Sequence, residues 1–261
     1  MTVLILVLIG MALGVTTALF GFGGGFVAVP VLVWVDASLG DGAARVAVAT
    51  SAVLMAVGAA VATASTSRDL LGALTRSRSM LVSLGVGGLV GALAARLVAG
   101  PVISWCFVAY LVATIVSVTA RPGFLDRAAG EPRPLRAELG LPIGAVAAFL
   151  GVGGSVLTVP VMRRAGHPMS SATALANPLT LAVAIPAAVV FLLAAGGTPA
   201  GAGGGFVGAV DVRAAAALLA GSIPVIVYLR RRGPRIPDAV HARCYLALLI
   251  VVAMAMVATL L

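Results

Sequence analysis

Two glycine-rich stretches of this chain could bind an anion with backbone amides alone. Residues 21–26 read GFGGGF and residues 151–156 read GVGGSV, and a VPV sequence follows each of them. A helix that begins within such a stretch presents unpaired N–H groups and the positive end of its dipole. Glycine has no Cβ atom, so a ligand can approach these amides closely. The expected donors are the amides of Gly23, Gly24, Gly25 and Phe26 in the first stretch, and of Gly153, Gly154 and Ser155 in the second.

Three further polar side chains, those of Thr50, Ser51 and Asn177, could donate hydrogen bonds to the same ligand. The competing interpretation is that such hydroxyls bond the backbone of their own helix. The eight acidic residues all fall at the ends of apolar segments or in the loops between them. The sequence therefore offers no buried carboxylate for a sodium or proton site. We expect an anion site that uses neither a metal nor a cofactor.

Close packing of helices is the competing explanation of both glycine stretches. Gly87 and Gly91, four residues apart in an apolar segment, are typical of that role. The glycine stretches differ from them because one pattern occurs twice, in equivalent places of two half-chains. Each copy also lies beside a short apolar segment. This arrangement favours binding over packing.

The elements that carry these stretches must be membrane helices. Of the 261 residues, 61% are hydrophobic and only 10% are charged, and the mean hydropathy is +1.17. A soluble domain has about 25% charged residues, so an ordinary soluble enzyme, a nucleic-acid-binding domain and a disordered protein are excluded. Segments 25–35, 139–150 and 156–162 are too short to cross a bilayer, and segment 2–20 runs straight into the first glycine stretch. Six segments are long enough to cross it: 43–66, 79–99, 102–120, 171–195, 211–229 and 238–261.

All seventeen basic residues are arginines, and most of them lie in groups between the apolar segments. Such groups are typical of cytoplasmic loops. Both chain termini are then expected on the opposite, outer side of the membrane. The four groups are Arg68, Arg76 and Arg78; Arg121, Arg127, Arg133 and Arg136; Arg163 and Arg164; and Arg230, Arg231, Arg232 and Arg235.

The two half-chains repeat each other. The glycine stretches are offset by 130 residues, and AVATS at 47–51 aligns with ALANP at 174–178. Each half has one glycine-broken helical hairpin and three membrane-crossing helices, and because three is odd the halves must have opposite orientations. We therefore predict an all-α polytopic membrane protein made of two inverted repeats, residues 1–120 and 139–261, joined by a basic cytoplasmic linker, residues 121–138.

These features resemble the sulfite exporter TauE/SafE family. The resemblance is carried by GFGGGF at 21–26 with Pro30 after it, by AVATS at 47–51 and by the degenerate second copy, and it extends over nearly the whole chain. It implies a transporter of sulfite, sulfonates or related sulfur-containing anions, with export the usual direction. Ser155 replaces the third glycine of the second copy, and Asn177 and Pro178 stand where the family usually shows Thr-Ser. Both departures fall at the predicted site.

The sequence and the resemblance together predict a secondary transporter of small sulfur oxyanions in a bacterial cell membrane. It would work by alternating access around an anion site at the membrane midplane. Its partners would be the anionic substrate and the lipid bilayer, with no nucleic acid, and either a monomer or a homo-oligomer fits the sequence. A passive anion channel is the alternative. An intramembrane hydrolase, with Ser155 as nucleophile and His241 or His167 as base, is a further hypothesis. A purely structural membrane subunit, suggested by the small-residue packing, is the last alternative.

Overall fold

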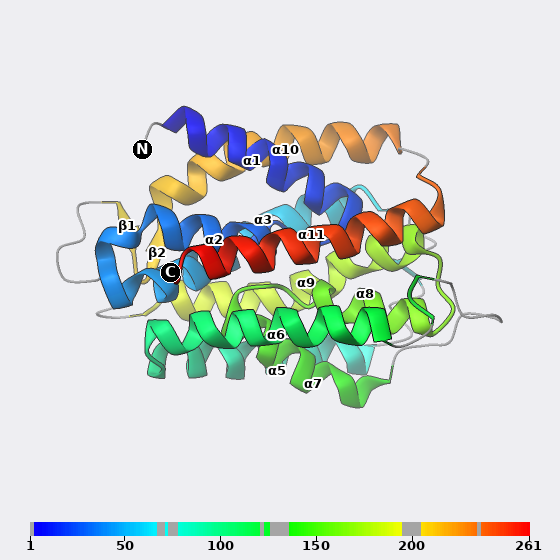
Figure 1. The fold of residues 1–261 in the computed structure, drawn as a ribbon, viewed down its shortest axis with the longest axis horizontal. Coiled ribbons are helices and arrows are strands. Elements are labelled where there is room, and N and C mark those ends of the chain that lie inside the picture. The colour runs from blue at the N-terminus through cyan, green and yellow to red at the C-terminus, as the bar shows by residue number, and fades with distance from the viewer. Residues whose placement is uncertain are drawn as a thin grey trace.

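A computed structural model describes residues 3–66, 71–72, 78–120, 123–125, 136–194, 205–233 and 236–261. The described chain is a bundle of helices with one small β-hairpin at its end (Figure 1). The strands β1 (Phe206–Val207) and β2 (Val210–Asp211) pair antiparallel. The helices are α1 (Val3–Phe20), α2 (Gly25–Val35), the 3-10 helix η1 (Ala37–Gly42), α3 (Ala43–Ala64), α5 (Arg78–Leu97), α6 (Gly100–Ala120), the 3-10 helix η2 (Ala137–Leu139), α7 (Gly140–Leu150), α8 (Ser155–Arg164), α9 (Met169–Leu192), α10 (Val212–Arg232) and α11 (Asp238–Ala258).

Seven helical segments in the described part of the chain are long and apolar enough to cross a membrane. Six of them correspond to the predicted crossing segments, and α1 is the seventh. The helices α2, α7 and α8 have 11, 11 and 10 residues. At 1.5 Å per residue each covers only about half of a bilayer core. The all-α polytopic membrane fold predicted from the sequence is therefore confirmed.

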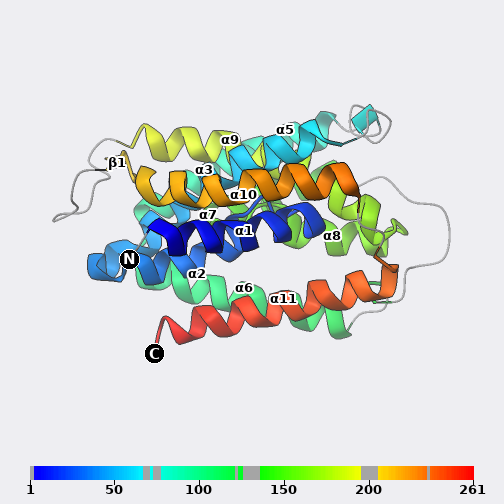
Figure 2. The same cartoon turned by 90° about the horizontal axis from the view of Figure 1, so that it is seen from above.

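Both chain termini lie at the same end of the bundle as the β1–β2 hairpin (Figure 1). Strand β2 leads directly into α10, so the arginines in the last turn of α10 lie at the other end, and Figure 2 shows α8 at that end too. The termini and these arginines thus lie at opposite ends of the bundle, as predicted. That the arginine-rich end faces the cytoplasm stays a prediction. Six of the grouped arginines lie outside the described residues: Arg68, Arg76, Arg121, Arg127, Arg133 and Arg235.

The first helix of each half-chain packs against a long helix of the other half. Helix α1 lies along α10, where a Cβ atom on Gly14 would come within 2.6 Å of the carbonyl oxygen of Ser222. Helix α7 lies along α5, where a Cβ on Gly87 would come within 2.9 Å of the amide nitrogen of Ala145. Gly87 and Gly91 therefore serve close packing, as expected. The exchange of helices brings the broken hairpins of both halves into the middle of the bundle.

Candidate functional site

Both glycine stretches interrupt their helices at the predicted places. Helix α1 ends at Phe20 and α2 begins at Gly25, while α7 ends at Leu150 and α8 begins at Ser155. We call the connecting segments glycine loop 1 (residues 21–24) and glycine loop 2 (residues 151–154). Positive φ angles occur in both loops, and side chains with a Cβ atom rarely adopt them. These angles are 75° at Gly21, 65° at Gly23, 93° at Gly24, 68° at Gly151 and 70° at Gly153.

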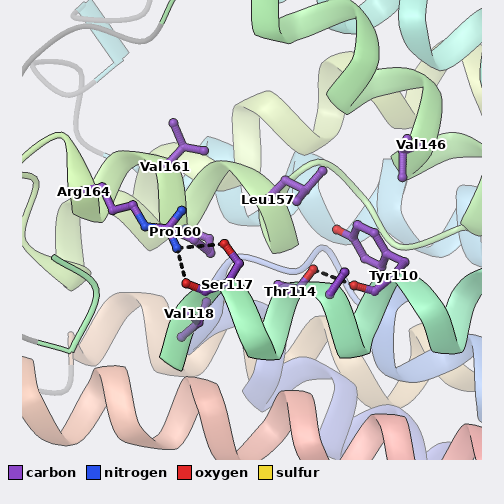
Figure 3. Close-up of a pocket in the computed structure, with 10 residues that line it drawn as sticks. Tyr110, Thr114, Ser117, Val118, Val146, Leu157, Pro160, Val161 and Arg164 are labelled. Atoms are coloured by element: carbon purple, nitrogen blue, oxygen red, sulfur yellow. Dashed lines mark hydrogen bonds between the residues drawn. The ribbon is translucent and has the colours of Figure 1, made fainter. Parts of the chain in front are cut away.

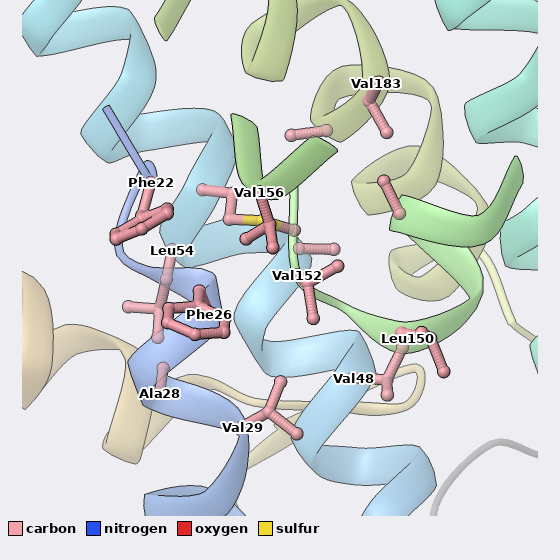
Figure 4. Close-up of a cluster of buried hydrophobic side chains, with 14 of the residues drawn as sticks. Phe22, Phe26, Ala28, Val29, Val48, Leu54, Leu150, Val152, Val156 and Val183 are labelled. Atoms are coloured by element: carbon pink, nitrogen blue, oxygen red, sulfur yellow. The ribbon is translucent and has the colours of Figure 1, made fainter. Parts of the chain in front are cut away.

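The two glycine loops touch each other inside the protein. A Cβ atom on Gly25 would lie 2.9 Å from the carbonyl oxygen of Gly151. One on Gly153 would lie 3.4 Å from the carbonyl oxygen of Phe22. In Figure 4 the side chains of Phe22 and Val152, one from each loop, belong to a single apolar cluster beside α3. The sequence-based expectation that the two stretches approach the same region therefore agrees with the structure.

The helices that leave the loops begin without a cap. No side chain caps α2 or α8. Along α2, the first backbone amide that donates a hydrogen bond to a carbonyl of glycine loop 1 is that of Ala28. Along α8, the first that donates to a carbonyl of glycine loop 2 is that of Leu157. Two uncapped helix N-termini thus lie in one region and offer unpaired amide donors to it. Within the described residues no acceptor faces the amides of Gly25, Phe26, Val27, Ser155 and Val156.

Four buried side chains near the loops each have an oxygen without a hydrogen-bond partner among the described residues: Thr17, Ser155, Asn177 and Thr180. The methyl carbon of Thr180 lies 2.9 Å from the position of a Cβ on Gly23 and 3.0 Å from that of a Cβ on Gly153. Asn177 donates its Nδ2 to the carbonyl oxygen of Thr173 at 3.3 Å and leaves Oδ1 unpaired. An unpaired buried polar group costs about 1–3 kcal/mol, so a polar ligand that paired with these groups would be stabilised.

The predicted site residues Thr50 and Ser51 make other contacts. The Ser51 hydroxyl lies 3.0 Å from the carbonyl oxygen of Gly151 and 2.8 Å from that of Val48, so it holds glycine loop 2 against α3. Thr50 instead accepts a hydrogen bond of 3.0 Å from the amide of Asp211 in β2. Adjacent residues of a helix project in directions about 100° apart, so both hydroxyls cannot face the same loop.

Thr17 and Thr180 were not among the site residues predicted from the sequence. A signal for Thr180 was present, because it follows Asn177 by three residues and residues so spaced share one face of a helix. Thr17 gives no comparable signal, because it lies four positions before Gly21 in a helix where Thr16 is the only other polar side chain. Its Oγ1 lies 3.5 Å from the position of a Cβ on Gly24.

The geometry offers Ser155 no catalytic partner. Its Oγ has no hydrogen-bond partner in the described chain. The Nε2 atom of His241 lies 2.7 Å from the carbonyl oxygen of Leu19 instead. His167 follows the C-terminus of α8, whereas Ser155 begins this 10-residue helix, so about 15 Å separates the two positions. The arrangement therefore does not support a hydrolase that uses Ser155.

A cavity of about 260 Å³ lies between α6, α7 and α8, and none of the predicted site residues lines it. Figure 3 shows Arg164 at one end, where its Nη2 donates to the carbonyl oxygen of Ser117 at 2.7 Å, and Tyr110 at the other. The glycine loops are instead enclosed, with Phe26, Ser155 and Asn177 each 0% exposed. A ligand could reach the loops only after a rearrangement of the surrounding helices.

One carboxylate is buried, contrary to the expectation that none would be. Asp36 directly follows the last residue of α2, is 7% exposed, and has an Oδ2 atom without a hydrogen-bond partner among the described residues. Burial, and to a lesser extent the charge of Asp211, raises the pKa of Asp36 to about 6. Asp36 lies at the opposite end of the 11-residue helix α2 from glycine loop 1, so it is no part of the site at the loops.

The substitution Asp36→Asn is expected to raise the melting temperature at about pH 7.5. The unfolded side chain ionises near 3.8 and the folded one near 6, so the folded state binds the proton more tightly. The wild-type protein consequently loses stability as the pH rises from about 4 to 6, and the neutral variant does not. Thermal unfolding in detergent between about pH 4 and 8 measures the difference, which should vanish at the acidic limit. Asp41→Asn, at an exposed position, is the control, and a lower melting temperature of Asp36→Asn at pH 7.5 would contradict the prediction.

Comparison with known proteins identifies the family. A family model described as Sulfite exporter TauE/SafE matches residues 6–256. The chain matches no curated protein and no solved structure. The matched range contains both glycine loops and all four buried side chains with an unpaired oxygen beside them. Because the match extends over nearly the whole length of this membrane protein, the chain belongs to the sulfite exporter TauE/SafE family of transporters.

Proposed function

We propose that this protein is a secondary transporter that moves a small sulfur-containing oxyanion, sulfite or an organosulfonate, out of the cell. The observation that carries the proposal is the meeting of two uncapped helix N-termini beside buried, unpaired hydroxyl groups. Half-helices that direct their N-termini at an anionic substrate are an established transporter arrangement. The family membership supports the substrate class.

Oxyanions suit this site because several oxygens can accept hydrogen bonds at once. In the proposed complex the amides of Gly25, Phe26 and Ser155 donate to the anion, and the hydroxyls of Ser155 and Thr180 add to them. Hydrogen bonds to charged groups contribute about 1.5–3 kcal/mol each, so a few of them offset much of the lost hydration. The amides of Gly23, Gly24, Gly153 and Gly154 line the same loops.

Alternating access would follow from an inverted relation of the two halves. Both halves show the same element order, in which a helix, a glycine loop and a short helix precede three long helices. The packing is also reciprocal, because α1 lies on α10 and α7 lies on α5. Rocking of one half against the other would expose the enclosed loops first to one side of the membrane and then to the other.

Purified protein in phosphatidylcholine vesicles tests the proposal. Uptake of radiolabelled sulfite is expected to saturate with concentration and to accelerate when the vesicles contain unlabelled sulfite. Sulfate, thiosulfate and an alkyl sulfonate, added as competitors, define the selectivity, and protein-free vesicles are the control. Flux that neither saturates nor responds to internal sulfite would indicate a passive channel. The proposal fails if none of these anions moves faster than in protein-free vesicles.

A further inference from the structure

Arg230 differs from the other arginines at its end of the bundle. It belongs to the last turn of α10, and its Nε and Nη2 atoms are buried with no hydrogen-bond partner in the described part of the chain. Its neighbours Arg231 and Arg232 are exposed, and Arg232 lies over the ring of Tyr228 at 4.8 Å. A cytoplasmic arginine that only orients the chain would be solvated, so Arg230 needs another explanation.

No acidic side chain on the neighbouring helices compensates the charge of this half-buried guanidinium. Helix α10 packs mainly on α1 and α3. Helix α1 contains no charged residue, and the only charged residue of α3 is Arg45, close to the opposite end of the bundle. The single salt bridge among the described residues joins Arg163 to Asp238. Partial burial of a cation without a partner is unfavourable, and an anionic ligand would reduce that cost.

Arg230 lies one helical turn beyond Ile226, a residue that packs near glycine loop 1. Helices α1 and α10 run in the same direction, because Gly10 meets Leu218 and Gly14 meets Ser222. A Cβ atom on Gly58 of α3 would lie 2.7 Å from the carbonyl oxygen of Gly23 and 3.8 Å from Cδ1 of Ile226. Arg230 follows Ile226 by one turn on the same face of α10. It therefore lies between glycine loop 1 and the arginine-rich end of the bundle.

We propose that Arg230 is an anion-binding residue, which holds the transported oxyanion on its way between the arginine-rich end and glycine loop 1. This inference depends on the transport function proposed above. The guanidinium supplies the fixed positive charge that the backbone amides of the loops do not. Its planar group can donate two parallel hydrogen bonds to one oxyanion. A phosphate group of a lipid shares this chemistry and is the competing source of the anion.

The test compares Arg230→Gln with Arg231→Gln in neutral phosphatidylcholine vesicles. Arg230→Gln is expected to raise the sulfite concentration for half-maximal uptake about tenfold or more, since it removes charged hydrogen bonds. Arg231→Gln is expected to leave this value unchanged. An unchanged value in Arg230→Gln would overturn the inference. If wild-type protein moves no anion at all, the transport proposal itself fails, which is a distinguishable result.

Thermal unfolding in detergent separates a binding role from a structural one. Without sulfite, Arg230→Gln is expected to melt at a higher temperature than the wild type, because a half-buried cation without a partner has been removed. Added sulfite should raise the melting temperature of the wild type and of Arg231→Gln but not that of Arg230→Gln. A lower melting temperature without sulfite would show that Arg230 is structural and would overturn the inference. The inference would also be overturned if Arg230→Gln lost the rise in melting temperature caused by anionic phospholipid but kept the rise caused by sulfite.

Discussion

Alanine in place of Gly24 is expected to abolish sulfite transport in vesicles while the protein still folds and inserts. Gly24 has the φ angle of 93°, and the nearest atom to a Cβ placed there is Oγ1 of Thr17 at 3.5 Å. The methyl group therefore meets no backbone and causes only conformational strain of about 1–2 kcal/mol. It fills the space between a helix N-terminus and an unpaired hydroxyl, where the anion is proposed to bind. We expect at least a tenfold lower initial rate.

Gly40→Ala is the matched control for this substitution. Gly40 also has a positive φ angle, 52°, and a Cβ there would have no atom within 4 Å. With ψ −126° at Gly40 and −24° at Gly24, alanine at Gly40 also introduces backbone strain, but far from the glycine loops, so its transport rate should equal that of the wild type. Wild-type transport by Gly24→Ala would remove glycine loop 1 from the mechanism. If both variants lost the same fraction of their transport rate, backbone strain alone would explain the effect.

Glycine loop 2 shows why the glycine chosen for substitution decides whether a loss of transport can be interpreted. A Cβ on Gly151 would overlap the Ser51 hydroxyl and lie 3.0 Å from Cα of Val48. Alanine at Gly151 would therefore displace α3, and a loss of transport there would report misfolding. Both glycine loops have the same sequence pattern, so only the structure separates a position with free space from one packed against backbone.

The helix breaks were predictable because their causes are local. Positive φ angles at Gly21 and Gly151 need glycine, and the length of an apolar run decides whether a helix can cross a bilayer. The direction in which a side chain points depends on packing between distant segments. Thr50 and Ser51 are equally polar neighbours, yet Thr50 accepts a hydrogen bond from β2 and Ser51 donates one to glycine loop 2. The sequence pattern cannot distinguish them.

Charged residues show the same limit. Arg163 and Arg231 both lie in arginine groups between apolar segments, and hydropathy treats them alike. The structure buries Arg163 completely and exposes Arg231. Asp36 was expected at a segment end, which is where it lies, yet the surrounding elements bury it. Burial of a residue at a helix end depends on what packs over that end, and this is a tertiary property.

Arg163→Met is expected to destabilise the protein by about 1–3 kcal/mol, because it leaves the carbonyl oxygen of Phe124 without its donor and removes the ion pair with Asp238, whose side chain is 42% exposed. Arg163 is fully buried, and its Nε and Nη2 donate to the carbonyl oxygen of Phe124 at 3.1 and 2.8 Å. Its Nη1 lies 2.8 Å from Oδ2 of Asp238, whose Oδ1 accepts the amide of Met169 at 2.7 Å. One guanidinium thus joins the end of α8 to Phe124 and to the first turn of α11.

Thermal unfolding in detergent measures this effect, and Arg232→Met is the control because Arg232 is exposed and lies over the ring of Tyr228. Such an exposed contact contributes about 0.5–1 kcal/mol, so the control should lose less stability. The double variant with Asp238→Asn should lose less than the sum of the two single losses, because both substitutions break the same pair. A melting temperature of Arg163→Met within the range of Arg232→Met would show that the buried pair does not hold α8 and α11 together.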